Sequence, residues 1–338
     1  MEENAASAVR CRDPQAAKSF SVLGLGMFAV LGATTALQLL LLPLVGRDPS
    51  DWKFWLGAFA PMYLVGIPLG CLIMRSVPKF PAVPGRKLTF GEMGTLFLIA
   101  FFLMYAGNLL GTFVSSSIAD SFGVQSANPV DELTIGSSLL PKILVMAILG
   151  PIMEELLCRR MLIDRMRVYG EKLAVLTSAA VFALFHGNLS QMFYAFSVGL
   201  LLGYVYLKTG KLRYSAILHI LLNSVSGVVA SLILERVDLD ALTSLDLRSL
   251  TALDPEQLLT VLSGQLPQLL LLEGYAFAVL GMGIAGLVLL CCKAKKVSFA
   301  PAEKELPKKA RFATVWGNFG MLLFFAACMA LIVISFFA

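Results

Sequence analysis

Residues 20–45 read FSVLGLGMFAVLGATTALQLLLLPLV, a stretch without a charged side chain. A helix needs about 20 mainly apolar residues to cross the hydrocarbon core of a bilayer, so this stretch predicts a membrane span. The composition of the whole chain agrees, because 58% of its 338 residues are apolar and only 14% are charged. Soluble domains carry about 25% charged residues. The sequence therefore predicts an all-α, polytopic membrane helix bundle.

Further apolar runs along the chain bring the expected number of transmembrane helices to about nine, or eight to nine. The runs cover residues 20–45, 54–74, 91–114, 138–166, 173–187, 190–207, 214–234, 267–292 and 313–337. They divide the chain into five parts: a tail (1–19), an N-terminal three-helix membrane region (20–137), a central helix core (138–235), an extracytoplasmic loop (236–266) and C-terminal membrane helices (267–338).

The basic residues predict the orientation. Of 27 lysines and arginines, 22 lie in the tail and in alternating segments along the chain, at 75–90, 158–172, 208–213 and 293–311. Short connections that are rich in Lys and Arg stay on the cytoplasmic side. We therefore expect a cytoplasmic N-terminus and a multi-pass protein of the cell membrane. The short loops and the lack of an organellar targeting pattern favour a bacterial plasma membrane.

Two classes of function are disfavoured by the same counts. The formal net charge is only +5, and the basic residues form no continuous stripe that would bind nucleic acid. The six cysteines form no CxxC pair, so the sequence indicates neither a disulfide framework nor a zinc finger. The expected partners are the lipid bilayer and a substrate within or at the membrane.

Charged residues interrupt one apolar run, where residues 150–160 read GPIMEELLCRR. Charged side chains inside a membrane are costly and mark functional sites. The two histidines of the chain, His186 and His219, also lie within apolar runs. Glu154 lies 16 residues before Gly170 in an expected helical turn, and His186 lies 16 residues after it. Because a helix rises 1.5 Å per residue, both lie roughly 24 Å from the turn and are expected to face each other.

Three pairs at i,i+4 spacing place polar groups on one face of each helix. The pairs are Glu155 with Arg159, Phe182 with His186, and His219 with Asn223. Three helices with one polar stripe each can enclose a single wet pocket. The sequence predicts such a pocket within the membrane.

These motifs, Glu154-Glu155-x-x-x-Arg159, Phe182-x-x-x-His186 and His219-x-x-x-Asn223, resemble the signature of the CAAX-processing and bacteriocin-processing (CPBP) family. This family of intramembrane proteases includes the type II CAAX prenyl endopeptidases. The resemblance covers about residues 138–235, which are then the catalytic helix core. It implies that a water activated on the first glutamate, Glu154, hydrolyses a peptide bond. The substrates implied are lipidated CAAX proteins in eukaryotes and bacteriocin- or pheromone-related peptides in bacteria.

The residues themselves suggest compatible roles. Adjacent carboxylates in a low-dielectric environment are not both cheaply ionised, and Arg159 lies one turn from Glu155, which favours a structural ion pair there. Glu154 has no cation at i+4 and is the candidate general base.

We expect the polar residues of the next two motifs to serve the reaction. His186 is expected to hold the water opposite Glu154, and His219 and Asn223 to donate to the developing oxyanion. Phe182 is expected to support the site. The alternative for both histidines is hydrogen bonding between helices.

No metal cofactor is favoured, because the two histidines lie on different helices and the chain has no HExxH motif. The alternative is a catalytic Zn²⁺ held by Glu154, His186 and His219, since catalytic zinc takes three protein ligands. Two other functions also stay open. One is an ion-coupled membrane transporter, since buried ionisable groups mark ion paths, and the other is a catalytically silent scaffold such as a bacteriocin-immunity protein.

Overall fold

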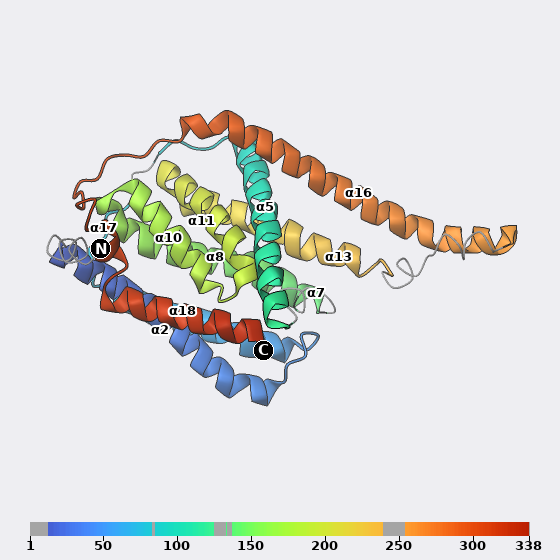
Figure 1. Ribbon diagram of the computed structural model, residues 1–338, viewed down its shortest axis with the longest axis horizontal. Coiled ribbons are helices and arrows are strands. Elements are labelled where there is room, and N and C mark those ends of the chain that lie inside the picture. The colour runs from blue at the N-terminus through green and yellow to red at the C-terminus, as the bar shows by residue number, and fades with distance from the viewer. Residues whose placement is uncertain (1–12, 83–84, 125–132, 134–136, 239–253, 338) are drawn as a thin grey trace.

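The computed structural model describes residues 13–82, 85–124, 133, 137–238 and 254–337, and every regular element among them is a helix. The N-terminal region forms α2 (Pro14–Val45), α3 (Trp52–Ala60), η1 (Pro61–Gly66), α4 (Ile67–Met74) and α5 (Phe90–Phe122). The C-terminal region forms α16 (Pro255–Lys293), η6 (Ala294–Lys296), α17 (Arg311–Val315) and α18 (Phe319–Phe337). Figure 1 shows a bundle from which the long helix α16 extends to one side.

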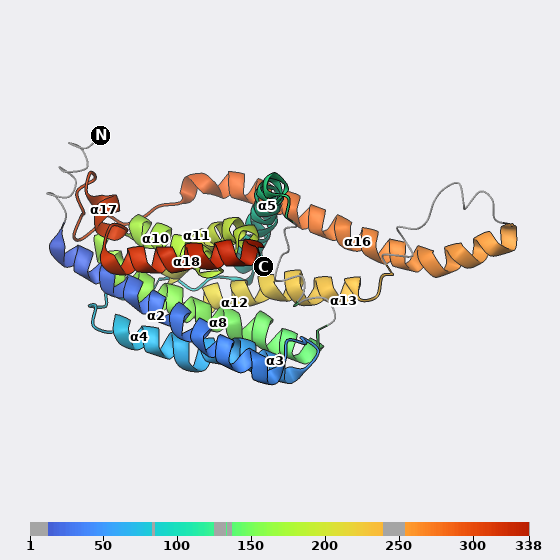
Figure 2. The ribbon, with the colours of Figure 1, turned by 60° about the horizontal axis from the view of Figure 1, so that its bottom comes forward.

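The central region begins with one almost continuous helical rod. The rod consists of α7 (Leu139–Pro141), η2 (Lys142–Leu149), α8 (Gly150–Glu155), η3 (Leu156–Ile163), α9 (Asp164–Met166) and η4 (Arg167–Tyr169). It turns at Gly170 into α10 (Glu171–Phe185), and α11 (Leu189–Thr209), α12 (Leu212–Asn223), η5 (Ser224–Val229) and α13 (Ala230–Leu234) follow. Figure 2 shows α8 and α12 between helices α2, α3 and α4 on one side and helix α5 on the other.

Several helices contain wide π-helical turns, namely η1, η2, η3 and η5. Proline has no N–H for the ordinary i→i−4 bond, and η1 begins at Pro61 while η2 follows Pro141 directly. Such π-helical turns occur frequently at functional sites. Two of them, η2 and η3, flank the short α-helix that carries both glutamates.

All nine apolar runs are helical, but they do not all meet the requirements for a span. Seven helices in the described part of the chain are long and apolar enough to cross a membrane. The rod at 139–169 carries too many charged residues to count as such a span. Helix α10 has 15 residues, which extend over roughly 22 Å and are therefore too short for the ~30 Å of the hydrocarbon core. The chain is thus a multi-pass membrane protein, and the count of nine stays a prediction.

The expected run at 313–337 is wrong as a single helix. The chain breaks at Gly317-Asn318, where α17 has ended and α18 begins. The Asn318 side chain accepts a hydrogen bond from the backbone N–H of Met321 at 3.1 Å, as a helix N-cap does. Residues 239–253 of the expected loop at 236–266 lie outside the described residues, and residues 255–266 are helical because α16 begins at Pro255.

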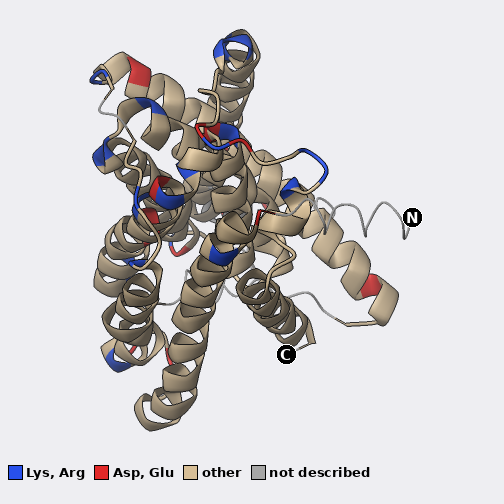
Figure 3. Cartoon of the chain, turned by 90° about the vertical axis from the view of Figure 1, so that its left-hand side faces the viewer, with Lys and Arg blue, Asp and Glu red and all other residues tan. Residues whose placement is uncertain are grey.

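The basic segments meet at one end of the bundle. The Phe80 N–H donates to the Asp164 carbonyl at 2.6 Å, and the Lys304 N–H donates to the Val168 carbonyl at 2.9 Å. The Gly85 N–H donates to the Thr209 carbonyl at 3.0 Å. These bonds join the segments 75–90, 158–172, 208–213 and 293–311, and Figure 3 looks onto this end, with Lys and Arg in blue. The shared end fits the predicted charge map, and its cytoplasmic orientation stays a prediction.

The opposite end of the rod is tied to α13 by a buried cation. Lys142 is 1% exposed, and its Nζ lies 3.0 Å from the Ser231 hydroxyl and 3.1 Å from the Glu235 carboxylate. Elsewhere large apolar side chains face outward, and Leu39, Leu109 and Phe277 are each more than 70% exposed. Apolar surface of this extent is expected where lipid takes the place of water.

Helices α2 and α18 pack backbone to backbone through glycines. A Cβ atom added to Gly24 would meet the backbone of Gly320, and one added to Gly320 would meet the Ser21 carbonyl. The Ser21 hydroxyl accepts a hydrogen bond from the Gly320 N–H at 3.0 Å. A larger side chain at either glycine must separate the two helices.

We expect Gly24→Val to destabilise the protein by about 1–3 kcal/mol, the usual cost of overpacking. Thermal unfolding in detergent measures this as a lower melting temperature. Gly32→Val is the matched control on the same helix, because a Cβ there meets no atom within 4 Å. Equal melting temperatures for the two variants would contradict the close α2–α18 contact.

Candidate active site

The second glutamate of the motif forms a fully buried ion pair. Glu155 and Arg159 are both 0% exposed, and Arg159 Nε donates to Glu155 Oε2 at 3.0 Å. Arg159 Nη1 donates to the Ser178 hydroxyl at 3.1 Å, and the guanidinium lies over the Phe182 ring, 5.4 Å from its centroid. The pairing expected from the i,i+4 spacing is present. It fastens η3 to α10.

The first glutamate has a different environment. The Glu154 side chain is 20% exposed, whereas that of Glu155 is 0% exposed. His219 of α12 lies between the two carboxylates, with Nε2 3.6 Å from Glu154 Oε2 and Nδ1 3.4 Å from Glu155 Oε1. Two adjacent glutamates are thus brought to one imidazole. Of the two, Glu154 is the one with exposed side-chain surface.

His186 lies at the end of α10, where a tight turn leads into α11. Its Nδ1 lies 2.8 Å from the Phe182 carbonyl, and its ring packs edge-on against the Phe182 ring. Since a carbonyl only accepts hydrogen bonds, Nδ1 must carry the hydrogen, and Nε2 of the neutral ring is left as an acceptor. His186 also interacts electrostatically with Glu154 and His219. The structure therefore brings His186 toward the pair formed by Glu154 and His219.

The turn after His186 is stabilised by one asparagine. Asn188 Oδ1 accepts from the Gln191 N–H at 2.8 Å and caps α11, while Asn188 Nδ2 donates to the His186 carbonyl at 3.3 Å. Gly187 adopts φ +66°, a conformation that glycine tolerates best. The turn thereby fixes the direction of the His186 ring.

Asn223 contacts the rod at η2, which precedes the short helix that carries the glutamates. Its Nδ2 donates to the Met146 carbonyl of η2 at 3.0 Å. A π-helical turn leaves backbone carbonyls without their ordinary partners, and the amide satisfies one of them. The amide has a second N–H, so the interaction with η2 does not use up its donors.

Two tyrosines, which the sequence did not single out, adjoin Glu154. Tyr63 of η1 and Tyr194 of α11 both interact electrostatically with the Glu154 carboxylate. A Cβ added to Gly150 would lie 3.2 Å from the Tyr63 hydroxyl and 4.0 Å from Glu154 Oε1. Gly150 therefore leaves space between these groups. The tyrosines come from helices outside the rod, so no local spacing indicated them.

Zinc binding by Glu154, His186 and His219 stays a prediction. Among the described residues, no group of three or more His, Cys, Asp or Glu side chains is arranged to hold a metal ion. Glu154 and His219 lie close together, and the Nδ1 of His186 lies 2.8 Å from the Phe182 carbonyl, which leaves its Nε2 as an acceptor.

An apolar cavity of about 820 Å³ lies behind the turn that carries His186. Its walls come from α5, α10, α11 and the α17–α18 region, and include Ala106, Ala183, Met192, Phe196 and Trp316. Ala183 belongs to the small buried cluster that contains Phe182. The cavity therefore adjoins the site through α10 and can take a hydrocarbon group.

Comparison with known proteins finds a family model that matches the segment containing the site. Residues 136–225 match the family model described as Type II CAAX prenyl endopeptidase Rce1-like, and this segment contains all three motifs. The resemblance drawn from the motifs is therefore confirmed for this segment, and the family supports a membrane protease of the CAAX type. The expectation of a role with bacteriocins stays a prediction.

One relative extends the similarity beyond that segment. The chain is 25% identical over 159 residues to the protein named "Putative membrane peptidase YdiL" of Bacillus subtilis (strain 168). The match covers 45% of this chain and 63% of the relative, so the chain spans less than two thirds of the relative's length. No solved structure matches the chain.

The different environments of the two glutamates predict different effects on stability. Glu155→Gln removes the counter-ion of a fully buried arginine and should destabilise the protein by about 3 kcal/mol. Glu154→Gln, at the partly exposed neighbour, should leave the melting temperature within a degree or two (about 0.5 kcal/mol) of wild type. Thermal unfolding in detergent compares them, and each variant serves as the control for the other. A larger loss in Glu154→Gln would reverse the structural assignment.

Proposed function

We propose that this protein is an intramembrane endopeptidase that hydrolyses peptide bonds of membrane-associated or lipidated substrates with a water activated by Glu154. The observation that carries the proposal is the contrast between the two glutamates. Glu155 is paired with Arg159 in a buried ion pair, whereas Glu154 is partly exposed, lies 3.6 Å from His219 and interacts electrostatically with His186. A general base needs water access and freedom from a permanent ion pair.

In the proposed reaction, the water lies between Glu154 and His186. The Glu154 carboxylate accepts one water hydrogen, and Nε2 of neutral His186 accepts the other in a hydrogen bond. The water oxygen then attacks the peptide carbonyl as its proton passes to Glu154. Glu154 next gives this proton to the leaving amide nitrogen, so it ends the cycle ionised.

In this proposal, His219 stabilises the negative charge that develops on the oxyanion during the reaction. Its Nε2 lies 3.6 Å from Glu154 Oε2, and a hydrogen on this nitrogen is the donor that we assign to the oxyanion, with the second N–H of Asn223 as its partner. One such donor contributes on the order of 10²–10³ in rate.

The apolar cavity suggests where the hydrophobic part of the substrate binds. It shares α10 with Phe182 and His186, so a hydrocarbon chain in the cavity would hold the attached peptide near Glu154. Small-molecule sites are typically cavities of this size with apolar walls. We therefore propose a lipidated or strongly apolar peptide as the substrate. The transporter and scaffold alternatives are not favoured.

We expect Glu154→Gln to lower peptide hydrolysis by about 10³-fold, since general-base catalysis contributes 10²–10⁴. The assay uses a quenched, lipidated peptide and protein in liposomes. Glu273→Gln on the exposed surface of α16 is the matched control and should keep full activity. Activity should also survive exhaustive chelation. Loss on chelation with recovery on adding zinc would replace the proposed water activation by a metal mechanism.

We expect Ala106→Phe to raise KM for a lipidated peptide by about tenfold, because the ring fills the cavity and excludes hydrocarbon worth at least 1.4 kcal/mol. The kcat value, and the kinetics of the same peptide without its lipid, should change little. Ala276→Phe on the exposed face of α16 controls for added bulk. A proportional effect on both peptides would show that the cavity does not hold the lipid.

A further inference from the structure

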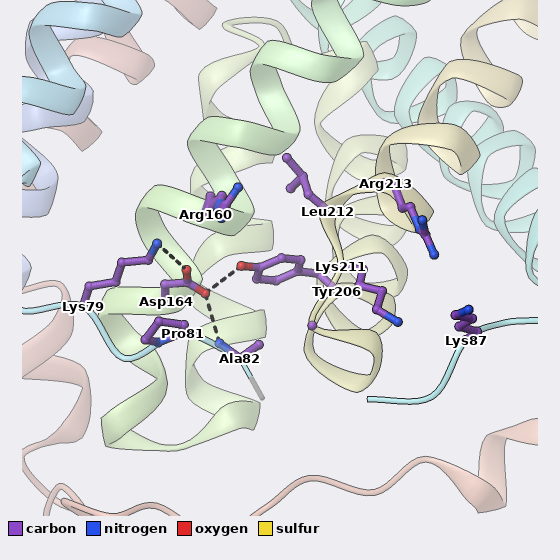
Figure 4. Close-up of a pocket in the computed structure, with 11 residues that line it drawn as sticks. Lys79, Pro81, Ala82, Lys87, Arg160, Asp164, Tyr206, Lys211, Leu212 and Arg213 are labelled. Atoms are coloured by element: carbon purple, nitrogen blue, oxygen red, sulfur yellow. Dashed lines mark hydrogen bonds and ion pairs between the residues drawn. The ribbon is translucent and has the colours of Figure 1, made fainter. Parts of the chain in front are cut away.

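A second cavity, strongly basic, lies at the end of the bundle where the basic segments meet. Its volume is about 530 Å³, and it opens between the 75–90 loop, the η3–α9 segment and the turn from α11 to α12. Five basic side chains and one acidic side chain line it: Lys79, Lys87, Arg160, Lys211, Arg213 and Asp164. Figure 4 shows Arg160 on one side of the pocket and Lys87, Lys211 and Arg213 on the other.

The one carboxylate of this pocket, that of Asp164, already has hydrogen-bond and ion-pair partners. Asp164 is 1% exposed, and its Oδ1 accepts hydrogen bonds from the Tyr206 hydroxyl at 2.8 Å and the Ala82 N–H at 3.4 Å. Lys79 Nζ lies 3.5 Å from its other oxygen. Asp164 therefore balances Lys79 and organises the wall of the pocket.

The other cations of the pocket lack an acidic partner. In the described residues, no carboxylate pairs with Lys87, Arg160 or Lys211, and the Arg213 guanidinium contacts only the ring and hydroxyl of its neighbour Tyr214. Four positive side chains therefore surround one polar cavity. An anion between them would be attracted by all four.

The backbone around the pocket is held in place. Gly85 donates to the Thr209 carbonyl, and a Cβ at Gly85 would collide with the Lys208 carbonyl. The Leu88 N–H lies 3.2 Å from the Tyr214 hydroxyl, which it donates to. These contacts fix the loop against α11 and α12, so the basic side chains extend from a defined wall.

We propose that this pocket binds a phosphate group. Lysine and arginine are the side chains that bind phosphate through charge-assisted hydrogen bonds, and the volume exceeds that of a lone ion. The pocket opens at the end of the bundle, where the apolar helices finish and lipid headgroups are expected. A headgroup phosphate of an anionic lipid and a soluble phosphate compound share this chemistry. The proposal does not rest on the proposed peptidase activity.

The binding experiment uses full-length Glu154→Gln protein in detergent, so that no hydrolysis intervenes. The probes are dioleoylphosphatidylglycerol, the zwitterionic dioleoylphosphatidylcholine and inorganic phosphate, and the readouts are native mass spectrometry and thermal stabilisation. The pocket variant is Lys87→Gln/Lys211→Gln/Arg213→Gln. The matched control is Lys295→Gln/Lys296→Gln/Lys308→Gln, which removes three exposed charges outside the pocket.

We expect one phosphatidylglycerol to bind in preference to phosphatidylcholine, and the pocket variant to weaken this binding by about tenfold or more, since each lost contact is charge-assisted. The control should change it by less than about twofold, because exposed charges away from the pocket are screened. Binding of inorganic phosphate alone, lost in the pocket variant, would also support a phosphate site and identify a soluble occupant.

Two results would overturn the proposal. Equal weakening by the pocket variant and the control would show a diffuse basic surface without a site. Binding of a peptide through its free C-terminal carboxylate, with no binding of phosphatidylglycerol or inorganic phosphate, would show a peptide site. If the triple variant does not fold, Lys211→Gln against Lys211→Arg gives the same comparison, since only the arginine keeps the charge.

Discussion

Arg159 is fully buried, and a guanidinium keeps its charge in any protein environment, so the surrounding helices must balance this charge where it lies. Glu155 supplies the negative charge from the same rod, while Ser178 and Phe182 bring α10 against the guanidinium. This explains how a helix as short as α10 keeps its place in a membrane protein. It is held by polar and aromatic contacts with the rod, in addition to its apolar surface. His219 then ties α12 to the same ion pair, so three helices depend on one buried cation.

The buried pair also separates the tasks of two neighbouring glutamates. Successive residues of a helix point about 100° apart, so Glu155 faces the interior while Glu154 points elsewhere, within electrostatic range of His186, Tyr63 and Tyr194. If Glu154 and Glu155 had the same environment, the two negative charges would oppose each other at low dielectric. The arrangement leaves one carboxylate permanently paired. In the mechanism proposed above, the other exchanges a proton with the substrate.

Sequence patterns predicted the features that depend on local spacing. Apolar runs predicted the helices, the i,i+4 spacing predicted the pairing of Glu155 with Arg159, and the charge map predicted which connections share one end. Features that depend on distant helices were out of reach. Tyr63 reaches Glu154 from a helix about ninety residues earlier in the sequence, and nothing near Asn223 indicates that its amide would bond to η2. The break at Asn318 was missed because hydropathy averages over a whole window, whereas a single capping residue decides where a helix begins.

The two adjacent arginines differ in environment, as the two adjacent glutamates do. Arg159 points inward to Glu155, whereas Arg160, one residue later, is exposed and lines the basic pocket. In the stretch Glu154-Glu155-x-x-x-Arg159-Arg160, Glu155 and Arg159 thus form a buried ion pair. Glu154 is partly exposed, and Arg160 lines the basic pocket. About six residues, or roughly 9 Å of helix, separate Glu154 from Arg160. The two sites therefore lie on one rod, on either side of the buried ion pair between Glu155 and Arg159.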